Sequence, residues 1–71
     1  MNKEQLLKKL GSRIRIIRIE KGMTQGELAN SIGKDQQSIQ RLESGRVNPS
    51  VFYLHEIALG LDVELKDLFH I

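Results

Sequence analysis

The sequence contains no cysteine, which excludes stabilisation by disulfide bridges and argues against a zinc finger. It also has no run of about 18 apolar residues, so we expect no membrane-spanning helix. Polar residues follow Met1, so no signal peptide is expected. Together these absences favour a cytoplasmic protein.

The chain shows no strand-like alternation of apolar and polar residues and no internal repeat. Its 71 residues, 39% of them hydrophobic and 28% charged, are typical of one soluble domain with a small core. We therefore predict a single all-α domain that spans residues 1–71.

Charge is distributed unevenly, although the net charge is only +2. Residues 1–22 hold seven lysines and arginines against two acids, whereas residues 51–71 hold one lysine against four acids. A basic front and an acidic tail are typical of a protein whose tail faces away from nucleic-acid phosphates. Ordinary surface charge explains the same distribution equally well.

Two short helical patterns lie between Thr24 and Gly45. Thr24 and Glu27 have the spacing of a capping box, which starts the first helix. Gly33 is suited to end that helix, because glycine tolerates left-handed backbone angles. Asp35 can cap the second helix. The segment therefore predicts a helix-turn-helix over about residues 24–45.

The second of these helices has an apolar side and a polar side. Ile39 and Leu42 are three residues apart and face inward. The other side carries polar groups at i,i+4 spacing: Gln36, Gln37, Gln40 and Arg41. Amides can pair with adenine and a guanidinium can pair with guanine. A lone glutamine would simply be solvated, but three on one capped helix favour contact with bases.

Further helices flank this pair. Asn2, with Gln5 in the capping-box position, starts a helix that closes at about 21–22. Its apolar stripe is Leu6, Leu10, Ile14 and Ile17. Gly11 should weaken this helix by about 1 kcal/mol relative to alanine, and we expect it to mark a frayed or kinked start.

After a loop at residues 45–49, Ser50 caps a fourth helix that reaches about Gly60, and Asp62 ends it. Its expected core face is Val51, Leu54, Ile57, Ala58 and Leu61. A short fifth helix should run from about residue 64 or 65 to Phe69.

Several residues give the sequence a resemblance to the helix-turn-helix of the phage repressor and Cro type: Gln25, Leu28, Ala29, Ile32, Gly33, Ile39 and Leu42. The pattern continues through Glu43, Gly45, Arg46, Asn48, Pro49 and Ser50, and the similarity spans about residues 10–69. The resemblance implies a compact five-helix, lambda-repressor-like DNA-binding domain. Arg41 departs from lambdoid repressors, which have Gln there, so the preferred bases should shift toward guanine.

The resemblance also implies roles for individual residues. Arg18 and Glu43 should form a partly buried ion pair. The alternative is that both charges are solvated. Gln25 should hold a backbone phosphate and steady Gln36. Three residues that flank the second helix of the helix-turn-helix are expected to contact phosphates: Lys34, Arg46 and Asn48. Ser38, within that helix, should contact a thymine methyl or a phosphate.

Apolar residues outside the core pattern suggest a partner surface. Phe52 and Leu59 are seven residues apart and share one helix face. We predict a dimer patch over helices four and five, within residues 50–71: Phe52, Leu59, Val63, Leu65 and Phe69. Scattered surface hydrophobes are the alternative.

The predicted function is sequence-specific binding of double-stranded DNA, as a homodimeric transcriptional regulator acting as a repressor on a near-palindromic operator. We therefore expect a cytoplasmic protein of bacterial or phage origin that is associated with the nucleoid. Two rivals keep the fold: an interaction module that has lost DNA binding, and an antitoxin that also binds a toxin protein. An enzyme is not expected, because His55 and His70 lack a catalytic partner. No metal or cofactor is expected either.

Overall fold

A computed structural model describes all of residues 1–71, and all of its regular secondary structure is helical. There are four α-helices followed by one 3₁₀ helix: α1 Lys3–Glu20, α2 Gln25–Ser31, α3 Gln36–Glu43, α4 Val51–Leu61 and η1 Leu65–Phe69. The all-α prediction is confirmed. The fifth helix lies at the expected place, but it is a 3₁₀ helix rather than an α-helix.

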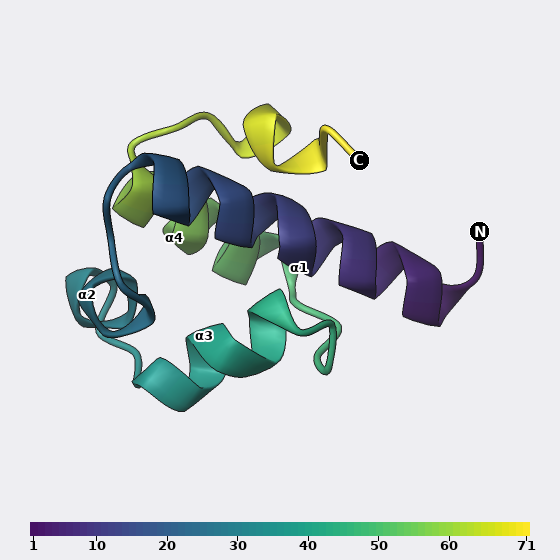
Figure 1. Cartoon of the computed structure of the whole chain (residues 1–71), viewed down its shortest axis with the longest axis horizontal. Helices are drawn as coiled ribbons and strands as arrows, with labels where there is room; N and C mark the ends of the chain where they lie inside the picture. The colour runs from purple at the N-terminus through teal and green to yellow at the C-terminus, as the bar shows by residue number, and fades with distance from the viewer.

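Helix α1 forms the long axis of the molecule. It contacts α3 on one side and η1 on another, while α4 lies behind it in the view of Figure 1. In that view η1 and α3 lie on opposite sides of α1 (Figure 1). The η1 segment at the acidic C-terminal end of the chain thus lies on the side of α1 opposite α3.

The helix boundaries follow the capping residues that the sequence predicts. Capping boxes are formed at Asn2 with Gln5 and at Thr24 with Glu27. The side chain of Asp35 caps α3, and that of Ser50 caps α4. These caps satisfy backbone N–H groups that have no partner within the helix, so each start is fixed locally.

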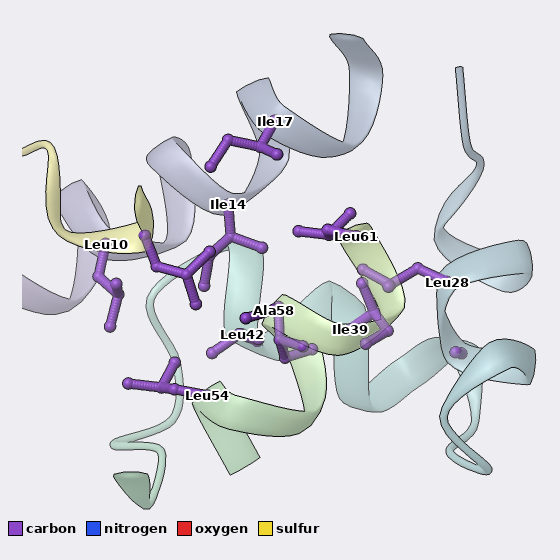
Figure 2. Packing of buried hydrophobic residues seen from close by; sticks show 12 residues of the cluster. Leu10, Ile14, Ile17, Leu28, Ile39, Leu42, Leu54, Ala58 and Leu61 are labelled. Atoms are coloured by element: carbon purple, nitrogen blue, oxygen red, sulfur yellow. The ribbon is translucent and has the colours of Figure 1, made fainter. Parts of the chain in front are cut away.

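The core is one cluster of twelve buried apolar residues to which all five helices contribute: Leu10, Ile14, Ile17, Leu28, Ala29, Ile39, Leu42, Leu54, Ile57, Ala58, Leu61 and Leu68. Figure 2 shows side chains of α1, α3 and α4 converging on one interior. Two residues expected in the core are exposed, namely Leu6 (41%) and Val51 (72%). Both lie near the starts of their helices, where they line a shared hollow beside Leu10 and Leu54.

Gly11 corrects a prediction. It does not mark a frayed start, because α1 is continuous from Lys3 and Gly11 is buried within it. A Cβ on Gly11 would lie 2.5 Å from the carbonyl oxygen of Glu43. Glycine is therefore needed here so that α1 can approach the C-terminal end of α3 closely.

None of the helices combines the length and hydrophobicity required to cross a bilayer. The structure also contains no group of three or more histidine, cysteine or acidic side chains placed to hold a metal ion.

Candidate nucleic-acid interface

Helix α3 has two faces of opposite character. Ile39, Leu42 and Glu43 are buried. Four polar side chains on the outward face are exposed: Gln36, Gln37, Gln40 and Arg41. The one side-chain hydrogen bond among these four is long, from Arg41 Nη2 to Gln37 Oε1 at 3.4 Å. Their donors and acceptors therefore remain largely free for a ligand.

A buried ion pair holds α3 from behind. Arg18 Nε donates to Glu43 Oε2 at 2.6 Å, and Arg18 Nη2 donates to Glu43 Oε1 at 3.0 Å. Arg18 Nη1 also donates to the carbonyl of Met23 at 2.7 Å. The hydrogen bond to Glu43 raises the pKa of Arg18 above its ordinary value, although burial acts against it. This fork geometry fixes α3 against α1 and against the segment that leads into α2.

Gln25 belongs to the same network. Its Nε2 donates to Glu43 Oε1 at 3.0 Å, and the residue is half-buried. No hydrogen bond joins Gln25 to Gln36, so the expected steadying contact is not present in this structure. The Gln25 amide instead connects the start of α2 to the end of α3. A second N–H of the same amide remains available to another acceptor.

Gln36 lies over the start of α2. A Cβ on Gly26 would be 3.7 Å from Gln36 Oε1, which is an ordinary van der Waals contact. The folded chain therefore does not itself require glycine at position 26.

The cap of α3 engages Ser38. Asp35 Oδ1 accepts hydrogen bonds from the backbone N–H and from the hydroxyl of Ser38, both at 2.8 Å. These bonds, the backbone one first, lower the pKa of Asp35, and Arg41 contributes in the same direction. The Ser38 hydroxyl proton is thus committed to the cap.

The basic and amide residues that flank α3 differ in their surroundings. Arg46 and Asn48 are exposed in the loop after α3. Lys34, in the turn before α3, is directed toward α4: its Nζ lies 3.9 Å from Glu56 Oε1 and 5.6 Å from the centroid of the Tyr53 ring. Sequence spacing gives no signal for this arrangement, because α4 follows Lys34 only after α3 and a loop.

Lys8 is a second neighbour that sequence reasoning missed. A Cβ on Gly45 would lie 2.9 Å from the backbone nitrogen of Lys8, so α1 closely approaches the second residue after α3. Lys8 is exposed and pairs with Glu4 at 3.1 Å. The basic character of α1 therefore extends to the C-terminal end of α3.

The predicted dimer residues differ in exposure. Phe52 and Leu59 are exposed on α4 (67% and 65%), whereas Val63 and Leu65 are half-buried and pack against the core. Phe69 is exposed elsewhere, beside a hollow of about 200 Å³ lined by residues of α1, α4 and the preceding loop. The expectation of an exposed Val63 was wrong, because the C-terminal segment folds back onto the core.

These features define a class of protein. Two short helices are joined by a turn in which Gly33 has a φ of +69°, and the second helix presents amides and a guanidinium to solvent. Its other face is locked by core residues and by the Arg18–Glu43 pair. This is the helix-turn-helix of DNA-binding domains.

Comparison with known proteins identifies the family. The model of the helix-turn-helix family HTH_3 matches residues 14–68, and the chain belongs to this family. The protein is thus a DNA-binding helix-turn-helix transcription regulator of the Cro/C1 type. The resemblance to phage repressors is confirmed.

Three similar proteins illustrate the range of the family. An uncharacterised HTH-type transcriptional regulator of Archaeoglobus fulgidus is 41% identical over 58 residues, which are 82% of this chain and 83% of that protein. The ImmF control region 10 kDa protein of Bacillus phage phi105 is 36% identical over 86% of this chain and 68% of its own length. The crystal structure of the restriction-modification controller protein C.AhdI from Aeromonas hydrophila superposes with a TM-score of 0.86 at 36% identity, covering 89% of this chain and 96% of that one.

Proposed function

We propose that the protein is a homodimeric repressor that binds a near-palindromic operator with α3 in the major groove. The observation that carries this proposal is the contrast between the two faces of α3. The outward side chains are free to bind, while hydrogen bonds to Glu43 hold the helix rigidly from behind. Rigid placement matters because a base-reading helix must keep its donors and acceptors in register with base edges.

The proposed base-reading residues are Gln36, Gln37, Gln40 and Arg41. Arg41 lies one helical turn after Gln37, which suits contact with neighbouring base pairs, and its guanidinium favours guanine. Ser38 fits contact with a thymine methyl better than donation to a phosphate, because its proton is already donated to Asp35.

The proposed phosphate contacts surround α3. Arg46 and Asn48 follow it in an exposed loop, and Lys34 precedes it. Gln25 can use its second N–H for a phosphate while the first stays with Glu43. Contacts of this kind position the domain without reading sequence.

Dimer formation is proposed because one short helix covers only a few base pairs. Two copies related by a two-fold axis would read half-sites about 34 Å apart. Phe52 and Leu59 on α4, within residues 50–71, are the exposed apolar residues that support such an interface.

The test is selection of bound sequences from random duplex DNA by the purified protein, with sedimentation of the free and bound forms. The expected result is a near-palindromic consensus with half-sites one helical turn apart and two protein copies on each duplex. Absence of any preference over calf-thymus competitor at low ionic strength would overturn DNA reading. Monomers alone, free and bound, would overturn the dimer and leave Phe52 and Leu59 for another partner, as the antitoxin alternative requires.

A second candidate role is control of a restriction-modification system. It is supported by the similarity to C.AhdI, which extends over 96% of that controller's chain. The same selection tests it, if the consensus is searched for upstream of restriction and methyltransferase genes. A consensus found only at unrelated promoters would exclude this role while leaving DNA binding intact.

A further inference from the structure

Two ion pairs connect different parts of the fold, and they differ in character. The Arg18–Glu43 pair is buried, with side chains 9% and 3% exposed. The Lys34–Glu56 pair joins the α2–α3 turn to α4 at 3.9 Å, with side chains 41% and 28% exposed. A loose and partly exposed pair contributes little to folding. Its presence beside α3 therefore invites a role in binding.

Two side chains of α4 attract the ammonium group of Lys34. Glu56 and Tyr53 are three residues apart and so share one face of that helix. The ammonium lies near the Glu56 carboxylate and 5.6 Å from the centre of the Tyr53 ring. A carboxylate and an aromatic face both attract a cation, so Lys34 has two partners within the protein.

We propose that Glu56 and Tyr53 compete with DNA for the ammonium of Lys34 and thereby lower the affinity of the protein for duplex DNA. The inference rests on the proposed function, in which Lys34 contacts a phosphate. Of the three cations that lie between residues 23 and 50, only Lys34 has an acidic partner on another element. Binding must replace this partner with a phosphate, so part of the electrostatic gain is lost.

The aromatic ring of Tyr53, and not its hydroxyl, attracts Lys34 in this competition. The Tyr53 hydroxyl is buried and has no hydrogen-bond partner. Burial, followed by the charges of Glu56 and Asp35, raises the pKa of Tyr53 above its ordinary value. Tyr53→Phe should therefore keep the competition, whereas Tyr53→Leu should weaken it.

A double-mutant cycle tests the competition, using the duplex recovered by selection. We expect Glu56→Gln to tighten binding about two- to five-fold, because an exposed pair of this kind has that strength. In a Lys34→Met background the same change should have no such effect. Glu64→Gln is the matched control, since Glu64 lies beside η1 and pairs with Lys66. It should change binding little in either background.

Two outcomes would overturn the proposal. An equal gain from Glu56→Gln in both backgrounds would mean that only a nearby negative charge had been removed. Weaker binding by Glu56→Gln would mean that Glu56 positions Lys34 for DNA instead of competing for it. Failure of the proposed function is distinct, because the wild-type protein would then show no preferred duplex at all.

Proton NMR of the Lys34 side chain supplies a second readout. The Lys34 ammonium lies 5.6 Å from the centroid of the Tyr53 ring, so a ring-current shift of the Lys34 methylene protons that disappears in Tyr53→Leu would report this contact. We expect the shift in the free wild type and in Tyr53→Phe, and its loss in Tyr53→Leu and on addition of duplex. A shift that persists in the bound state would show that Lys34 never leaves α4.

Discussion

On the inward face of α3, Ile39 and Leu42 are buried and the Glu43 carboxylate accepts three hydrogen bonds from Arg18 and Gln25. On the outward face, four polar side chains share a single hydrogen bond of 3.4 Å. In this helix of eight residues, the polar group on the inward side is therefore well hydrogen-bonded within the protein, whereas those on the outward side are almost unbonded.

The two faces of α3 have different roles: the inward residues contribute to the stability of the fold, and the outward residues are available for DNA binding. Leaving a buried charged or polar group without a partner costs free energy of folding. Exposed amides are satisfied by water, which a base edge can replace. Substitutions behind α3 should therefore change stability, whereas substitutions in front should change binding.

The largest effect is expected for Arg18→Met. It strands the Glu43 carboxylate in a buried site and should lower the free energy of unfolding by about 3–5 kcal/mol. Urea unfolding followed by circular dichroism measures this. The double variant Arg18→Met, Glu43→Leu should recover much of the loss, because no buried charge remains. An unchanged unfolding midpoint in the single variant would contradict the assigned role.

Gly11→Ala should be the next most damaging change. A methyl group would collide with the backbone carbonyls at the end of α3 and separate α1 from it, at a cost of about 2–3 kcal/mol. Thermal unfolding measures the loss. Gly26→Ala is the matched control, because a methyl group has room there and should leave stability equal or raise it by up to about 1 kcal/mol. Equal behaviour of the two variants would refute the close approach of α1 to α3.

On the outward face, Gln37→Ala should leave the unfolding midpoint unchanged and weaken operator binding by about 1–3 kcal/mol, with relaxed base preference. Arg46→Gln should weaken binding to all duplexes alike and reduce its salt dependence. Fluorescence anisotropy measures the affinity of each variant for the selected duplex and for a scrambled duplex. Equal loss on both duplexes after Gln37→Ala would exclude base reading by this residue.

The smallest effect concerns the cap between the two faces. Hydrogen bonds from Ser38 lower the pKa of Asp35 in the folded state, so its contribution to stability is present above the unfolded value of about 3.9. That contribution is lost as the pH falls through the lowered pKa. Asp35→Asn should therefore melt below wild type at pH 7, and the gap should narrow as the pH falls below about 4. A gap that stays constant with pH would mean that the charge contributes nothing.

Local chemistry made the helix boundaries predictable. The capping pair Thr24 and Glu27, the cap Asp35 and the turn glycine Gly33 act through backbone groups within a few residues, so their effect is written in the adjacent sequence. The outward face of α3 follows from helical periodicity for the same reason. The Arg18–Glu43 pair required the family resemblance, because 25 residues separate its members.

Errors arose where distant segments meet. Helix propensity makes Gly11 a weak point of α1, but its role depends on the backbone of α3. Val63 was expected on the surface, but it packs against the core after the chain turns at Asp62, whose φ is +56°. The attachment of Lys34 to Glu56 and Tyr53 gave no local signal at all.

The all-helical class, the helix-turn-helix and the polar face of α3 can be read from the amino-acid sequence, because capping and periodicity act over a few residues. The packed fold is needed to show which side chains of that face are free, which glycine is required and which cation lies against α4. These depend on distances between segments remote in the chain, and only the packing of the whole core fixes such distances.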